Sequence, residues 1–365
     1  LSLMPEGTVK HSSQQISEHF DFFGSFISIG ADRDFAKVTV YSLNKYLSQT
    51  LEMLEEIVKE PTFPQEELEI WSKKGKYNLT VELDKTSTLS RMEFFRRLFG
   101  SEHAYGTFAM PNDYDSIKRE SLTNFHSQRI SSSDAILVLA GKTDDNHIKL
   151  IEKHIGNTNW GNQNVSTSDF LPKALNSTGK YFVHKPNALQ SAIRVGREMF
   201  PRTHPDFTDM VVINTILGGY FGSRLMKNIR EDKGYTYGIG STLAPLRDSG
   251  FFAISTEVGA EFTKQTLNEI KSEVEKLKTE PISSSELQTV KNYMMGDILR
   301  SFNGPFSISD NIIGLLNFNN LEYEYFNKQI DSVKNITPER IIELSKMWLD
   351  QNLMVECVAG AEDPF

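Results

Sequence analysis

The chain has 365 residues, of which 39% are hydrophobic and 24% charged, enough for two domains of ordinary size with their own cores. Its formal net charge of −9 argues against a nucleic-acid-binding protein, because duplex binding depends on clustered Lys and Arg side chains. No run of about 18 apolar residues is present, so the sequence predicts no membrane span. The composition does not indicate a compartment.

Two segments of the chain, residues 24–74 and 234–292, carry the same series of predicted elements. Each begins with a Gly after a helix and continues as two alternating strands around a turn rich in Asp and Arg. Each then enters an amphipathic helix that ends in Glu-Pro, and another helix opens with Glu-Leu, at Glu67 and at Glu286. The shared order of these landmarks indicates an internal duplication and a fold of the α+β class.

Both halves are predicted to close on an apolar strand, at 134–141 in the first half and at 352–360 in the second. The segment 157–179 is rich in Asn, Ser, Thr and Gly and is typical of an interdomain linker. We therefore predict an N-terminal domain over 1–156 and a C-terminal domain over 180–365.

The second half opens with two predicted strands, "KYFVHKP" and "ALQSAIRVGREMF", that have no counterpart in the first half. By symmetry we expect about two strands and part of a helix to precede Leu1. The first domain is then incomplete at its N-terminus.

Residue types that bind zinc are not arranged in a recognisable motif. The single cysteine, Cys357, lies in the apolar run "LMVECVAG" and is predicted to be a buried strand thiol, which excludes a disulfide within the chain and a cysteine-rich metal site. None of the eight histidines stands in H-x-x-E-H, H-E-x-x-H or H-x-H. They are His11, His19, His103, His126, His147, His154, His184 and His204.

The stretch "LGGYFGSRLMKNIREDKGYTYGIGS" holds the candidate binding residues. Gly234 is predicted to end a helix, with Arg230 in its last turn, and Tyr237 is predicted on the next strand, on the same face as Tyr235 and Ile239. An Arg and a Tyr that converge in this way could hold a peptide carbonyl or stabilise an oxyanion. Periodicity alone favours the simpler interpretation, a surface Arg and a half-buried Tyr without a function.

The chain resembles the insulinase and pitrilysin-type zinc peptidases. The second half carries the resemblance in "VINTILGGYFGSRLMKNIREDKGYTYGIGSTL", "DSGFFAISTEVG" and "SSSELQTVKNYMMGDI", and the first half in "EGT", "FPQEELE", "HAYGT" and "DAILVLAG". The mitochondrial-processing-peptidase-like branch is the most similar. The resemblance implies two duplicated domains, each a mostly antiparallel sheet backed by helices.

Active members of that family carry an H-x-x-E-H zinc motif on a helix before a Gly-Thr that resembles Gly7-Thr8 here. By this resemblance the motif's Glu falls on Leu1 and its second His on Ser2. The later Glu ligand falls on Asn78, and a supporting acid falls on Trp71. None of these side chains suits a zinc site that activates water, so the resemblance implies a chain that binds no metal.

In the same family an Arg and a Tyr of the C-terminal half reach the zinc site of the partner and hold the substrate backbone, and they match Arg230 and Tyr237. The resemblance thus implies a non-catalytic subunit that pairs with a zinc-bearing paralogue to cleave unfolded or short polypeptides. Gly218, Gly219 and Gly222 are possible loop contacts. The alternatives are a pseudopeptidase that acts as a scaffold, and an active zinc peptidase with ligands outside this chain.

Overall fold

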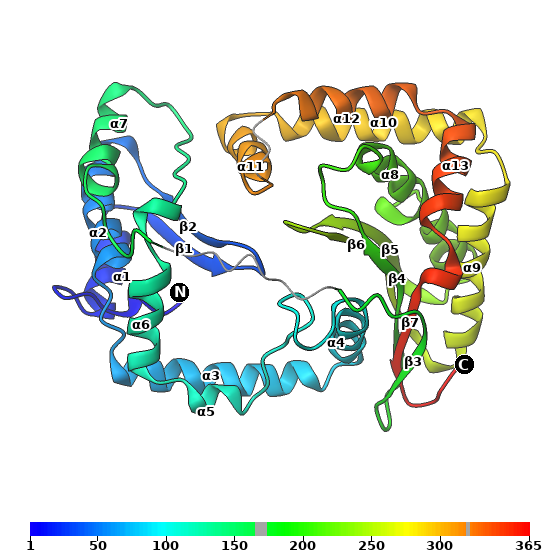
Figure 1. Ribbon diagram of the computed structural model, residues 1–365, viewed down its shortest axis with the longest axis horizontal. Coiled ribbons are helices and arrows are strands. Elements are labelled where there is room, and N and C mark those ends of the chain that lie inside the picture. Colours follow the sequence, from blue (N-terminus) through cyan, green and yellow to red (C-terminus); the bar gives the residue numbers. More distant parts are fainter. Residues whose placement is uncertain (165–173, 319–321) are drawn as a thin grey trace. The chain divides into compact units, whose positions relative to one another are not determined.

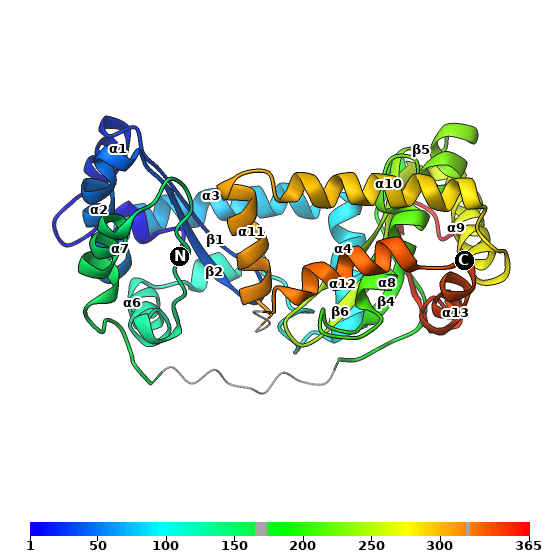
Figure 2. The same ribbon diagram turned by 90° about the horizontal axis from the view of Figure 1, so that it is seen from above.

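The computed structural model describes residues 1–164, 174–318 and 322–365, which form two compact units (Figure 1, Figure 2). The first unit comprises Leu1–Val81 and Ala109–Phe170, and the second comprises Glu82–Phe108 and Leu171–Phe365. Both units contain an antiparallel hairpin followed by two helices, so the predicted α+β class and the duplicated order of elements are confirmed. Residues 165–173 of the predicted linker lie outside the described part of the chain.

The first unit is built around a hairpin and the helix that follows it. Strands β1 (Phe26–Ala31) and β2 (Ala36–Tyr41) pair antiparallel, and α2 (Leu47–Lys59) buries Met53 and Ile57, which lie one helical turn apart. The other elements are the 3₁₀ helices η1 (Met4–Glu6), η2 (Asn44–Tyr46) and η3 (Ser132–Asp134), the α-helices α1 (Ser13–Phe22), α3 (Gln65–Leu83), α5 (Asp113–Ser116), α6 (Arg119–Arg129) and α7 (Asp145–Ile151), and the π-helix η4 (Glu152–Gly156).

A buried carboxylate holds the turn that follows η1. Glu56 of α2 is 6% exposed and accepts hydrogen bonds from Lys10 Nζ at 3.1 Å and the Thr8 hydroxyl at 3.3 Å, and His11 Nδ1 lies 2.8 Å from its Oε2. Burial disfavours the charged form of Glu56, but the hydrogen bonds from His11 and Lys10 outweigh burial and lower the pKa of the carboxyl below its usual value. The charged Glu56 therefore ties residues 8–11 to α2.

We expect Glu56→Gln to lower the free energy of unfolding by about 1–3 kcal/mol at pH 7, because it removes the charge that these donors share. A carboxyl whose pKa is lowered on folding stabilises the native state above its unfolded pKa and loses that contribution as the pH falls through its folded pKa. The difference between wild type and variant, measured by urea titration, should therefore shrink below the ordinary pKa of 4.5. A difference that stays constant under acid conditions would contradict this role of Glu56.

The second unit contains a five-stranded sheet with the strand order β3-β7-β4-β6-β5. β3 and β7 are parallel, and the other neighbours pair antiparallel, so the sheet is mostly antiparallel, as predicted. The predicted opening strands and closing strand of this half are confirmed as β3, β4 and β7. The bounds are β3 (Gly179–His184), β4 (Gln190–Met199), β5 (Thr236–Pro245), β6 (Gly250–Gly259) and β7 (Val355–Gly360).

Helices cover one face of this sheet. α9 (Thr263–Thr279) turns Leu267, Ile270, Val274 and Leu277 towards the core at helical spacing, and none of the four is more than 4% exposed. No helix of the described residues is long and apolar enough to cross a bilayer. The remaining elements are α8 (Phe207–Asn214), η5 (Thr215–Gly219), η6 (Met226–Asp232), η7 (Ala260–Phe262), α10 (Ser284–Ser301), α11 (Pro305–Leu316), α12 (Glu324–Asn335), α13 (Pro338–Trp348) and η8 (Gln351–Leu353).

Helix α4 (Thr86–Phe99) covers the opposite face of the sheet (Figure 1). Phe94 and Leu98 of α4 are at most 1% exposed and share an apolar cluster with Val355 and Cys357 of β7. The prediction of a buried strand thiol is confirmed, and burial raises the pKa of Cys357 to about 12. The thiol therefore serves packing and is not activated as a nucleophile.

The two compact units do not coincide with the predicted domains 1–156 and 180–365. The predicted domains follow the sequence repeat, whereas the compact units follow packing. Residues Glu82–Phe108 join the second unit, although they belong to the first half by sequence. The physical reason is that α4 buries its apolar side against the second sheet, a tertiary contact that no local pattern reveals.

The predicted strand at 134–141 does not form. Residues 135–140 belong to no strand of the described structure, and Ile136 and Leu137 are 68% and 47% exposed. The equivalent strand of the second half, β7, is held between β3 and β4, the two strands that have no counterpart in the first half. A strand needs neighbours for its main-chain hydrogen bonds, and the segment 134–141 has none here.

Candidate functional site

The predicted Arg–Tyr pair lies where two π-helical segments meet β5, the edge strand of the second sheet. The π-helix η5 continues α8 into the glycine-rich loop 218–222, and the π-helix η6 carries Arg230. Such wide helical turns are rare in proteins and are frequent at functional sites. Their presence on both sides of this loop favours a binding region over a purely structural one.

The guanidinium of Arg230 is free to bind a ligand. It makes no hydrogen bond or ion pair with any residue that the structure describes, and its Cζ lies 4.7 Å from the ring centroid of Phe221. Phe221 is 63% exposed, so its ring supports one face of the guanidinium and leaves the N–H donors available. Phe221 is a candidate site residue that the sequence prediction missed, and the aromatic pair in "GGYFGSR" was the available signal.

Tyr237 is 96% exposed on β5. The prediction that it shares a strand face with Tyr235 and Ile239 is wrong, because the ladder between β5 and β6 contains a β-bulge in which Tyr237 and Gly238 both stand opposite Glu257. The extra residue changes the alternation, so that Ile239 turns into the core at 5% exposed and Tyr237 turns to solvent. The bulge thus presents the phenol outside the protein.

A tight turn at Gly234 joins the two candidate residues. Gly234 has a φ of +67°, a left-handed conformation that suits glycine, and it ends η6 as the sequence predicts. The N–H of Tyr235 donates to the carbonyl of Ile229 at 3.1 Å across this turn. Arg230 and Tyr237 are therefore carried by two regular elements that one glycine connects.

Hydrogen bonds to neighbouring helices fix the segment that carries Arg230. Arg224 donates to both carboxylate oxygens of Glu286 on α10, at 2.7 and 3.0 Å. Asn228 donates to Glu269 at 3.0 Å and to Glu273 at 2.7 Å, both on α9. The backbone below Arg230 is held in place by two helices, which is the support that a preorganised binding group requires.

At least one glycine of the loop, Gly218, is required by close packing. A Cβ on Gly218 would lie 2.5 Å from the backbone nitrogen of Ser241 on β5, so a side chain there would force η5 away from the strand. Gly219 is the last residue of η5, and Gly222 follows three residues later. Contacts between this loop and a substrate stay a prediction.

In the first unit, the positions that match the zinc site of active relatives hold other side chains, and two of them, Leu1 and Trp71, match the catalytic base and a supporting acid. Leu1 and Trp71 both pack against an apolar cluster that includes Met4, Met53 and Ile57 of the described chain. Neither side chain has a carboxylate that could act as a base or support a zinc ligand, so these two positions serve packing.

The other two degenerate positions, Ser2 and Asn78, are exposed. Across residues 1–164, 174–318 and 322–365, no group of three or more His, Cys, Asp or Glu side chains is placed to hold a metal ion. Metal content of the purified chain is the measurement that decides whether the chain binds zinc.

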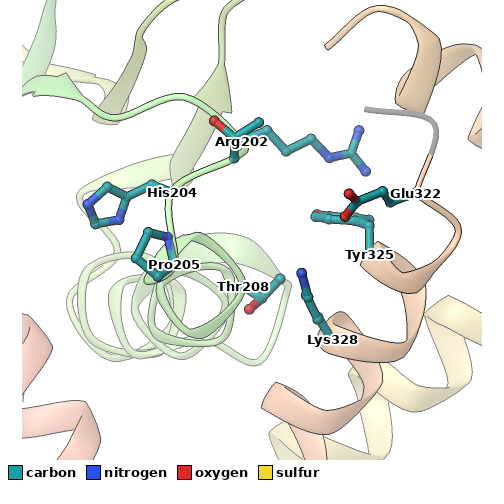
Figure 3. A pocket seen from close by; sticks show the side chains of 8 residues that line it. Arg202, His204, Pro205, Thr208, Glu322, Tyr325 and Lys328 are labelled. Carbon is teal, nitrogen blue, oxygen red and sulfur yellow. The ribbon is translucent and has the colours of Figure 1, made fainter. Parts of the chain in front are cut away.

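A small cavity of about 80 Å³ lies elsewhere in the second unit, beside α8 and α12 (Figure 3). Arg202 reaches over it, stacks on Tyr325 with Cζ 4.0 Å from the ring centroid, and donates to the carbonyl of Gly314 at 3.0 Å. Neither Arg230 nor Tyr237 lines this cavity. Its main cation is engaged in packing, so the cavity is a weaker candidate than the Arg–Tyr region.

The middle of the chain matches a known protein family. Residues 116–294 match the model described as the peptidase M16 inactive domain. Residues 116–294 belong to the peptidase M16 family. An uncharacterized zinc protease of Bacillus subtilis, YmxG, is 25% identical over 338 residues, which cover 87% of this chain and 80% of that protein. An uncharacterized zinc protease of Rickettsia felis is 23% identical over 299 residues, which cover 80% of this chain and 70% of that protein.

Two solved structures share the fold of this chain. The crystal structure of a peptidase M16 inactive domain from Pseudomonas fluorescens has a TM-score of 0.89 at 22% identity, covering 99% of this chain and 87% of that one. A protease from Helicobacter pylori has a TM-score of 0.88 at 16% identity, covering 98% and 87%. At these identities the likeness shows the fold alone, and it confirms the processing-peptidase-like architecture that the sequence resemblance implies.

Proposed function

We propose that this M16 chain is the non-catalytic, substrate-binding subunit of a two-subunit zinc endopeptidase of the mitochondrial-processing-peptidase-like type. The observation that carries the proposal is the contrast between the two sets of predicted site residues. Arg230 makes no ion pair among the described residues and Tyr237 is exposed, whereas Leu1 and Trp71 pack into an apolar cluster. A chain that keeps the binding groups and lacks the acidic side chains of the zinc site fits a partner that supplies the metal.

Arg230 and Tyr237 have the chemistry to hold a peptide at the bond being cleaved. A guanidinium donates hydrogen bonds to a carbonyl oxygen, and more strongly to the oxyanion that forms when water attacks that carbonyl. The Tyr237 phenol donates one further hydrogen bond to an acceptor of the same kind. The zinc ion of the partner subunit would supply the activated water. Preorganised donors are effective because they need no rearrangement at the moment of reaction.

Reconstitution with a zinc-bearing paralogous subunit tests this function. The partner is identified by mass after co-purification from the native source, and hydrolysis of a denatured, labelled casein is followed with each subunit alone and with both. We expect zinc in the partner, none in this chain, and hydrolysis that requires both subunits and stops on chelation.

Two other outcomes would overturn the proposal. Stoichiometric zinc in the isolated chain would indicate an active peptidase with ligands other than the positions considered above. A co-purifying partner without zinc, and no hydrolysis by the assembled complex, would indicate a pseudopeptidase that acts as a scaffold. Both measurements use the whole chain, so neither depends on separating the two units.

A further inference from the structure

Helix α4 covers only part of the sheet face against which it packs. α4 packs mainly against β4, β7 and β3, at one end of the strand order, whereas β6 and β5 lie at the other end. Tyr237 of β5 stands opposite Glu257 of β6 on these outer strands, and both side chains are exposed. The open part of this face therefore adjoins one member of the Arg–Tyr pair.

Arg194 lies on the same face, at the border of the part that α4 covers. In the ladder it stands between Cys357 of β7 and Ser255 of β6. Its neighbours in sequence, Ile193 and Val195, point into the apolar cluster on the opposite face. Because side chains alternate along a strand, Arg194 points to the α4 side, with Cys357 and Ser255.

The guanidinium of Arg194 is half-buried and has no ion-pair partner. It makes no hydrogen bond or ion pair with any described residue, and its nitrogens are not among the fully enclosed polar atoms, so they stay open to solvent. Burial and the charge of Arg91 lower the pKa of Arg194, and the weaker attraction of Glu257 does not offset them. A half-buried guanidinium without a carboxylate is unfavourable, so an anion from outside would stabilise it.

Arg91 brings a second positive charge to the same place. It lies on the exposed side of α4 and makes no ion pair with a described residue. By contrast, Arg97 on the same helix pairs with Glu93 at 2.6 Å and stacks over the ring of Tyr181 at 4.0 Å. Arg91 and Arg194 thus bring two unpaired positive charges to the border of the open face.

We infer that Arg194 and Arg91 form a subsite for a carboxylate of the polypeptide that Arg230 and Tyr237 hold. The inference rests on the proposed function and names a substrate class, peptides that carry an acidic side chain or a free C-terminus at this point. A guanidinium matches a carboxylate with two parallel hydrogen bonds, and a second guanidinium adds attraction. The subsite would then select acidic over neutral segments.

Peptide binding by the whole chain tests the subsite. The probe is a labelled, unfolded, amidated peptide with one Glu, compared with the same peptide carrying Gln, and fluorescence anisotropy gives the Kd of each. We expect the Glu peptide to bind about tenfold more tightly, a usual value for one charge-assisted hydrogen bond, and the difference to fall with added salt. Arg194→Gln should remove the preference and leave the Kd of the Gln peptide unchanged.

Three further measurements serve as controls and identify the group that is bound. Arg300→Gln removes the same charge from the exposed side of α10 and should leave the preference intact. Glu257→Gln removes a competing carboxylate and should strengthen binding of the Glu peptide. The Gln peptide with a free C-terminal carboxylate, compared with its amide, distinguishes a C-terminus from an acidic side chain as the group that is bound.

Equal binding of the Glu and Gln peptides, absence of binding by either, or the same loss of preference in Arg300→Gln would overturn the subsite. These outcomes are distinguishable from failure of the proposed function. Hydrolysis of the neutral Gln peptide by the two-subunit complex should depend on Arg230 and be unaffected by Arg194→Gln. Loss of the subsite alone would therefore leave that hydrolysis in place.

Discussion

Arg230→Ala should lower kcat/KM of the two-subunit enzyme by about 10²-fold or more, which is the usual cost of removing one donor to a developing oxyanion. The guanidinium has no ion pair to a described residue and its helix is fixed by Arg224 and Asn228, so the substitution removes a binding group and leaves its support in place. Hydrolysis of a labelled unfolded peptide gives the rate, and size-exclusion chromatography should show that the heterodimer still forms. A fall mainly in kcat would indicate that Arg230 acts in the transition state.

Lys227 provides the matched control for this result. It lies on η6 as well, is exposed, and makes no side-chain hydrogen bond within the described residues, so Lys227→Ala removes one positive charge from the same helix without touching the pair. Tyr237→Phe should have a smaller effect, about tenfold, because it removes a single neutral hydrogen bond. If Arg230→Ala leaves hydrolysis unchanged, the assignment of the pair to substrate binding is wrong.

The parts of the fold that follow from local periodicity were predictable from the sequence. The alternation in "DSGFFAISTEVG" predicts β6, and the spacing of Leu267, Ile270 and Val274 predicts α9, because both elements bury one side against the same cluster. The duplication strengthens these assignments, because the same series of elements is predicted independently in each half.

Other parts depend on contacts between distant residues. Segment 134–141 has the composition of a strand, but a strand forms only beside partners, and β3 and β4 have no counterpart in the first half. The apolar side of α4 could be buried against the hairpin of the first unit or against the second sheet, and its sequence does not indicate which of the two it covers. Both departures concern tertiary neighbours, which periodicity does not encode.

The candidate site also combines features that local sequence predicts with features that depend on distant residues. The spacing of Arg230, Gly234 and Tyr237 was sufficient to predict a helix, a turn and a strand. The orientation of Tyr237 was not, because a bulge of one residue opposite Glu257 reverses the alternation without any change in composition. The unpaired charge of Arg194 was also hidden, since an Arg within an apolar strand gives no sign of whether an acidic side chain lies nearby.

Phe94→Ala should lower the free energy of unfolding of the second unit by about 3–5 kcal/mol, the usual cost of removing a fully buried aromatic ring. Phe94 is 0% exposed and joins α4 to Val355 and Cys357 of β7. Hydrogen exchange measured by mass spectrometry should show lost protection in β3, β4 and β7, because α4 covers these strands. The hairpin of β1 and β2 should keep its protection.

The control is Phe22→Ala on α1, where the ring is 81% exposed and a change within about 0.5 kcal/mol is expected. The location of the lost protection decides whether residues 82–108 are part of the second unit, as the packing of α4 indicates. Lost protection in β1 and β2 instead would place α4 with the first half, where the repeat alone predicts it. The second sheet would then need another cover for the apolar side chains of β7, and the border that exposes Arg194 would not exist in the folded protein.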